Sequence, residues 1–153
     1  MNRSRYLTRN IDKTDHAIIA ALTADGRMTI TDLAEQIGMS SPSVAARILK
    51  MKDAGAIQCY TVVIDPFAFG LCIAAHVRMN AIPGQMSRLA QMLKDTPQVV
   101  EANHVSGKDC YLAKVMTRDM SELESVIATF SPLAATDAEV ILSSTVPRRL
   151  PKI

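Results

Sequence analysis

The sequence lacks several features that would each indicate a different class of protein. No apolar run approaches the ~20 residues that a membrane-spanning helix requires, so we expect no membrane partner. The basic N-terminus has no apolar segment after it and is therefore not typical of a secretory signal. The sequence has only three cysteines, far apart in the chain, which predict reduced thiols in a cytoplasmic protein and no disulfide framework.

Aromatic residues are also scarce, at 4%, whereas hydrophobic residues make up 48% and charged residues 21% of the 153 positions. This composition indicates a packed globular protein of one ordinary domain or two small ones. The formal net charge is only +2, so the molecule as a whole does not attract polyanions strongly. Arg3, Arg5 and Arg9 crowd a basic tail over residues 1–10, which either reaches a polyanionic partner or is a disordered tail.

Acidic residues are absent from residues 39–52, MSSPSVAARILKMK. As a helix, this stretch has an apolar row of Val44, Ile48 and Met51 beside a polar and basic row of Ser43, Arg47 and Lys50. A solvent-exposed face usually mixes both signs of charge, so the acid-free row indicates an anionic partner. The alternative is an ordinary solvated amphipathic helix.

Two further helices precede this stretch. Asp12 and Asp15 have the spacing of a capping box for the first helix. The second helix begins near Thr29, buries a stripe that starts at Ile30, and ends at Gly38, where a left-handed cap is required. Two short helices joined by a tight turn, the second with a basic row, predict a helix-turn-helix at about residues 30–49. In that motif the second helix lies in the DNA major groove.

The periodicity changes after the third helix. Residues 57–65 are rich in β-branched side chains and predict a wing or linker strand, and residues 71–81 alternate with the period of a strand. The following patterns predict a helix around Leu89, strands over 99–106 and 110–117 joined by the short loop 107–109, a helix capped by Asp119, and a strand over 137–146. This order, βαββαβ, is the ferredoxin-like arrangement.

A ferredoxin-like sheet has helices on one face only, which leaves its other face open. The predicted strands contain many apolar residues that we expect to need cover: Val100, Ala102, Leu112, Val140 and Leu142. A second copy of the chain is the economical cover, so we predict a homodimer.

The predicted fold class is α+β, with an N-terminal winged helix-turn-helix followed by a ferredoxin-like α/β-sandwich domain. The expected divisions are a tail over 1–10, the helix-turn-helix domain over 11–60, a linker over 61–70, the second domain over 71–146 and a tail over 147–153.

Enzyme chemistry has little support in the residue pattern. Cys72 and His76 lie four residues apart on a predicted strand, about 13 Å at ~3.3 Å per residue, which is too far to share a metal ion. His104 and Cys110 bracket the hairpin without a third ligand at suitable spacing. We therefore assign no catalytic residue, metal ligand or cofactor.

Three segments, in order, resemble the Lrp/AsnC family of bacterial and archaeal transcription regulators. They are IDKTDHAIIAAL, then DGRMTITDLAEQIGMSSPSVAARILKMKDAGAIQCYTVVIDPFAFG, and VSGKDCYLAKVMTRDMSELE. The resemblance covers roughly residues 11–146 and implies an operator-binding dimer that often assembles to octamers, with an amino acid or related metabolite as effector.

Together, the residue pattern and the resemblance nominate two sets of site residues. The DNA-binding set is Ser40, Ser41, Ser43, Val44, Arg47 and Lys50, and the effector-binding set is Ser106, Gly107, Lys108, Asp109, Cys110, Tyr111 and Thr136. Cys110 stands where many members have an acid before the tyrosine, and Ala138 replaces the second threonine of the family pattern in the last strand. Two other functions remain open here: a tetrapyrrole decarboxylase-like enzyme on the same plan, and a sensing module without DNA binding.

Overall fold

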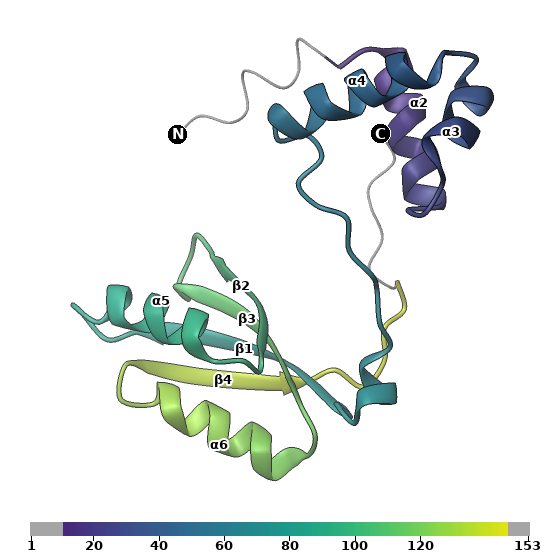
Figure 1. Cartoon of the computed structure of the whole chain (residues 1–153). Coiled ribbons are helices and arrows are strands. Elements are labelled where there is room, and N and C mark those ends of the chain that lie inside the picture. The colour runs from purple at the N-terminus through teal and green to yellow at the C-terminus, as the bar shows by residue number, and fades with distance from the viewer. Residues whose placement is uncertain (1–10, 147–153) are drawn as a thin grey trace. The chain divides into compact units, whose positions relative to one another are not determined.

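The computed structural model describes residues 11–146, which form two compact units divided between Val63 and Ile64. The first unit contains three helices: α2 (Lys13–Ala24), α3 (Ile30–Ile37) and α4 (Ser41–Asp53) (Figure 1). The tails predicted over residues 1–10 and 147–153, with their arginines, lie outside the described residues.

Local capping signals set the helix boundaries of the first unit, as the sequence predicts. Asp12 and Asp15 form a capping box at the start of α2, and the Thr29 side chain accepts the Asp32 N–H at the start of α3. Gly38 ends α3 with a φ of 74°, the left-handed conformation that glycine adopts without strain. The three helices bury a common core of Ile18, Ala21, Leu33, Ala34, Val44, Ile48 and Met51.

Two details of the first unit differ from the prediction. Ile30, expected in the buried stripe of α3, is 39% exposed because it occupies the first residue of the helix. The wing or linker strand expected over 57–65 is not formed within the described residues, and that segment lies outside every strand of the sheet. Val62 and Val63 there are 82% and 91% exposed.

The second unit is a four-stranded antiparallel sheet in the order β2-β3-β1-β4, with α5 and α6 on one face (Figure 1). Its elements follow the predicted order after a short 3₁₀ helix: η1 (Pro66–Phe69), β1 (Ile73–Ala81), α5 (Met86–Asp95), β2 (Val99–His104), β3 (Tyr111–Thr117), α6 (Met120–Phe130) and β4 (Ala134–Val140). The ferredoxin-like arrangement is therefore confirmed.

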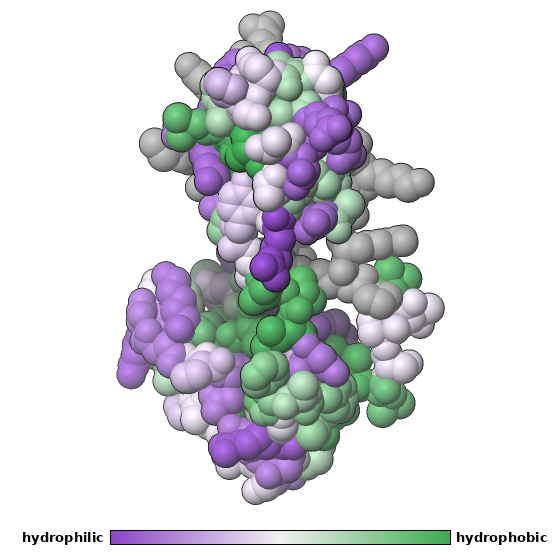
Figure 2. Space-filling view, turned by 45° about the vertical axis from the view of Figure 1, so that its right-hand side comes forward, coloured by the Kyte–Doolittle hydropathy of each residue, from purple (hydrophilic) through white to green (hydrophobic). Residues whose placement is uncertain are grey.

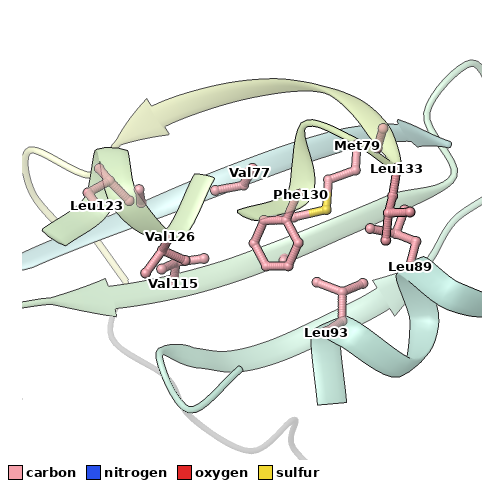
Figure 3. Close-up of a cluster of buried hydrophobic side chains, with 12 residues drawn as sticks. Val77, Met79, Leu89, Leu93, Val115, Leu123, Val126, Phe130 and Leu133 are labelled. Atoms are coloured by element: carbon pink, nitrogen blue, oxygen red, sulfur yellow. The ribbon is translucent and has the colours of Figure 1, made fainter. Parts of the chain in front are cut away.

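The core of this unit lies between the sheet and its two helices. Phe130 of α6 and Leu89 of α5 are fully buried against Met79 and Val77 of β1 (Figure 3). The alternation predicted for β1 is confirmed, since Ala75, Val77 and Met79 are all fully buried and His76 between them is exposed.

Some strand boundaries were wrong. β4 covers Ala134–Val140 instead of 137–146, because its pairing with β1 begins at Ala81 opposite Ala134. The β2–β3 loop is longer than the predicted three residues. β2 ends at His104, and the last backbone bond runs from the Val105 N–H to the Cys110 carbonyl at 3.0 Å.

The open face of the sheet is more polar than the prediction required. Ala102 and Val140 pair with Ala113 and Ala75, so they lie on the same face of the sheet as the core, although both are exposed themselves. The opposite face instead carries a charge cluster in which Arg78 Nη2 bonds to Asp137 at 3.0 Å and Glu139 at 2.7 Å. Leu112 pairs with Arg78 and shares this face, so apolar and charged side chains are mixed there.

Glu122 links the start of α6 to the strand before it. Its carboxylate accepts hydrogen bonds from the Arg118 backbone and guanidinium and from the Gln98 amide, at 2.9–3.1 Å. The Arg118 guanidinium is the largest cause that lowers the pKa of Glu122, to about 2.

We expect Glu122→Gln to lower the melting temperature at pH 7. Because the folded-state pKa is depressed, the ionised carboxylate stabilises the fold above its unfolded pKa near 4.5, and this stabilisation is lost as the pH falls toward 2. Thermal unfolding between pH 7 and pH 2.5 should show the difference in melting temperature between variant and wild type becoming smaller below about pH 4.5. Glu124→Gln, at an exposed site on the same helix, is the control. A difference that stays constant across this range would contradict the assignment.

Candidate DNA interface and effector site

The N-terminus of α4 presents hydroxyl groups to solvent. Ser40 is the N-cap: its Oγ accepts the Ser43 N–H at 3.4 Å and lies 2.8 Å from the Ser43 Oγ. Pro42 in the first turn lacks an N–H that would have no partner there. Ser40 and Ser43 are exposed, whereas Ser41 is half-buried. The first turn of α4 is thus a small polar surface without a bulky side chain.

The apolar row of α4 is buried as predicted. Val44 is fully buried, and Ile48 and Met51 are 6% and 3% exposed. The family pattern placed Val44 among the DNA-binding residues as well. Its burial excludes a direct contact with DNA in this conformation, so that assignment was wrong and Val44 is a core residue.

Arg47 has partners that the sequence pattern did not reveal. Its Nη1 donates to Asp12 Oδ2 at 2.7 Å and to Asp15 Oδ1 at 2.8 Å. These bonds raise the pKa of Arg47, while the Asp15 backbone N–H and then the Arg47 guanidinium lower the pKa of Asp12. Arg47 of the basic row is therefore not a free cation, because the carboxylates of Asp12 and Asp15 hold its guanidinium.

The missed contact joins residues 32 and 35 positions apart in the chain. The capping box and the basic row were each visible in the sequence, but nothing in their spacing shows that they meet. One available signal was the absence of acids from residues 39–52, which meant that any partner of Arg47 had to come from another helix.

Lys50 is the cation of this row that has no ion pair within residues 11–146, and it is exposed. Lys52, in the last turn of α4, lies over the Tyr60 ring with its Nζ 4.9 Å from the centroid. The surface of α4 available to an anion therefore includes the first-turn serines and Lys50, with the exposed Lys52 in the last turn.

The predicted effector residues divide between two hollows of the second unit. One hollow of about 330 Å³ is lined by Arg78, Asn80, Lys108, Asp109, Ala135, Thr136 and Asp137. It brings three of the predicted residues, Lys108, Asp109 and Thr136, to one place beside the Arg78 charge cluster. Cys110 is adjacent, with its Sγ 3.8 Å from the Asn80 side-chain oxygen.

Tyr111 lines a different hollow, of about 530 Å³, between α5 and β2. Its ring lies 5.2 Å from that of His104, which borders the same hollow. Ser106 and Gly107 are exposed in the β2–β3 loop and line neither hollow. The structure therefore does not gather the predicted effector residues into a single site.

The requirements of a metal site and of a membrane-spanning helix are not met in the described part of the chain. Among residues 11–146, no group of three His, Cys, Asp or Glu side chains is arranged to hold a metal ion. None of the helices in that range has the length and apolar character that a membrane crossing requires. Cys59 and Cys72 are exposed and Cys110 is half-buried, all as free thiols.

Two family models match the chain. The model of the AsnC-type helix-turn-helix domain matches residues 11–52, and the model of the Lrp/AsnC ligand binding domain matches residues 74–151. The two matches fall on the helical unit and on the unit that contains the sheet.

Similar curated proteins carry regulator names. The proline dehydrogenase transcriptional activator of Rhodobacter capsulatus is 29% identical over 96% of this chain and 100% of that protein. The regulatory protein AsnC of Haemophilus influenzae is 31% identical over 78% of this chain and 81% of that protein.

Solved structures share the fold over nearly the whole chain. Bacillus subtilis LrpC is 27% identical with a TM-score of 0.85, covering 90% of this chain and 98% of that chain. The feast or famine regulatory protein of Mycobacterium tuberculosis, complexed with L-methionine, is 25% identical with a TM-score of 0.87, covering 94% and 99%.

Proposed function

Because this chain belongs to the Lrp/AsnC family of transcriptional regulators, we propose that it reads operator DNA with α4 and responds to an amino acid bound in its second unit. The chain is a regulator and not an enzyme. We place its activity in the cytoplasm, where its DNA target lies. A pair of such helices in a dimer would occupy successive major grooves, ~10 bp apart or a multiple of that spacing.

The first turn of α4 and Lys50 support this proposal most directly. Ser40, Ser41 and Ser43 form its first turn, the part of a recognition helix that reaches base edges. Hydroxyl groups bond equally to phosphates and bases, and small side chains let the helix approach the groove closely. Lys50 lies two turns further along the same row, where it can meet a phosphate.

The direct test is a gel shift of the full chain with the DNA upstream of its own gene, against a duplex of shuffled sequence. We expect a discrete complex at a protein concentration at which the shuffled duplex stays free. Equal binding to both duplexes, or binding to neither, would contradict sequence-specific recognition at that site.

Lys50→Ala should weaken binding to the upstream DNA and to shuffled DNA by similar factors, because a phosphate contact carries no sequence information. Removing one such contact should reduce the slope of log K against log salt by about 0.9. Titrations at several salt concentrations measure both quantities. Lys94→Ala, an exposed lysine of α5 in the other unit, is the matched control. An unchanged slope for Lys50→Ala would exclude the phosphate contact.

The hollow beside Arg78 supports an amino acid as the effector. Its lining carries both signs of charge, with Arg78 and Lys108 as cations and Asp109 and Asp137 as anions. A free amino acid carries a carboxylate and an ammonium group close together, so it matches such a lining. The L-methionine in the complex of the M. tuberculosis protein agrees with this class of ligand.

A thermal-shift screen of the full chain against the twenty amino acids tests this assignment. A true effector should stabilise the fold by about 2.7 kcal/mol at a concentration 100 times its Kd. Asp109→Asn should abolish the shift, whereas Asp95→Asn, on an exposed surface of α5, should retain it. A shift that survives Asp109→Asn would place the ligand elsewhere, and no shift for any of the twenty would contradict the effector class.

A homodimer, with higher assemblies such as an octamer, is the proposed form of the protein. Exposed hydrophobic residues gather into patches in one view of the surface (Figure 2). The extended segment before η1 contributes Val62, Val63 and Ile64, and η1 itself contributes Phe67 and Phe69, each more than half exposed. A segment that is extended, rich in β-branched residues and unpaired is a template for pairing with another chain. Linker pairing, and not an apolar sheet face, is therefore our basis for the dimer.

Val63→Lys should shift the mass distribution from dimer toward monomer at micromolar concentration, because the charge would be buried in the interface. Mass photometry or sedimentation measures the shift. Met120→Lys, an equally drastic change at an exposed residue of α6, should leave the distribution as in wild type. A wild-type protein that is monomeric at this concentration would contradict the dimer.

A further inference from the structure

The start of α2 and the middle of α4 are joined by a closed set of hydrogen bonds. Asp12 Oδ1 accepts the Asp15 N–H at 2.9 Å, and Asp15 Oδ2 accepts the Asp12 N–H at 3.1 Å. The remaining oxygens, Asp12 Oδ2 and Asp15 Oδ1, both accept from Arg47 Nη1, at 2.7 and 2.8 Å. All four carboxylate oxygens of the capping box are thus in use.

Burial makes this cluster costly to open. The Asp15 side chain is only 6% exposed, whereas the side chains of Arg47 and Asp12 are 31% and 54% exposed. If Arg47 moved to a DNA phosphate, it would leave Asp15 charged and buried without its cationic partner, which is strongly unfavourable. The two carboxylates would also lie near the DNA phosphates and repel them, since a single guanidinium cannot neutralise two carboxylates and a phosphate.

The cluster supplies a directional restraint that the apolar contacts of α4 lack. Val44 and Ile48 hold the helix against α2 and α3 through non-directional burial, which tolerates small rotations about the helix axis. Charge-assisted hydrogen bonds are short and angle-dependent, so they resist such rotation. Arg47 lies between Ser43 and Lys50 in the same row, and fixing it fixes the direction of both neighbours.

We propose that Arg47 is a positioning residue: it anchors α4 to the capping box of α2 and thereby aims Ser43 and Lys50 at DNA, without contacting DNA itself. This inference rests on the proposed DNA-binding function. It assigns Asp12 and Asp15, two acids that would repel DNA, a positive role in binding it.

Removing the charge of Asp12 or Asp15 distinguishes a positioning role of Arg47 from a direct DNA contact, because the two roles predict changes in DNA affinity of opposite sign. Asparagine caps a helix as well as aspartate does, so Asp12→Asn removes the charge and retains the cap. If Arg47 contacted DNA, Asp12→Asn and Asp15→Asn would free it and raise the affinity. If Arg47 positions α4, we expect affinity for the upstream DNA to fall, about threefold for Asp12→Asn and about tenfold for Asp15→Asn, because the Asp15 side chain is the more buried of the two.

Asp53→Asn is the matched control for charge, since Asp53 is an exposed acid of α4 without an ion pair within residues 11–146. It should bind DNA as tightly as wild type or slightly more tightly.

Arg47→Lys retains the positive charge but not the shared contact to both carboxylates, so it should lose affinity about as much as Arg47→Ala. Neither Arg47→Lys nor Arg47→Ala should change the slope of log K against log salt, which a lost phosphate contact would reduce by about 0.9.

Tighter binding by Asp15→Asn, or wild-type binding by Arg47→Lys together with a reduced slope for Arg47→Ala, would overturn the proposal. Thermal unfolding of Arg47→Ala, Asp15→Ala and the double variant provides a readout without DNA. We expect the double variant to lose less melting temperature than the sum of the single losses. Additive losses would overturn the anchor, whereas absence of DNA binding by the wild-type chain would instead reject the proposed function.

Discussion

The orientation of α4 on its two neighbouring helices is the constraint on which the DNA-reading surface depends. Burial of Val44, Ile48 and Met51 decides which side of the helix faces inward. The contacts of Arg47 with Asp12 and Asp15 then fix the rotation of the helix more narrowly than apolar packing does. The outward surface then consists of a first turn of small hydroxylated residues and Lys50, the cation of this row that has no ion pair among the described residues.

The two faces of the sheet in the second unit carry different kinds of side chain. The helix-covered face holds a continuous core around Phe130 and Met79, and the other face holds charged side chains that meet across strands. The hollow beside Arg78 lies where β1, β4 and the β2–β3 loop converge. A ligand there would contact three separate segments, so its binding would alter the restraints between them. That is the physical basis on which an effector would shift a population of conformations or assemblies.

Features encoded by neighbouring residues could be predicted from the sequence. The capping box at Asp12, the left-handed glycine at Gly38 and the alternation of β1 each depend on a few consecutive positions, and the structure confirms them. Features that depend on distant partners could not. The Arg47 anchor, the start of β4 and the faces of Ala102 and Val140 are set by pairing between remote segments, which periodicity does not specify. The effector residues were nominated by resemblance, and the structure gathers only some of them.

The most direct measurement is a structure of the protein bound to its operator DNA. The account predicts that Arg47 Nη1 stays within hydrogen-bonding distance of both Asp12 and Asp15 while the first turn of α4 lies in the major groove and Lys50 meets a phosphate. A guanidinium that has left both carboxylates for a base or a phosphate would contradict it.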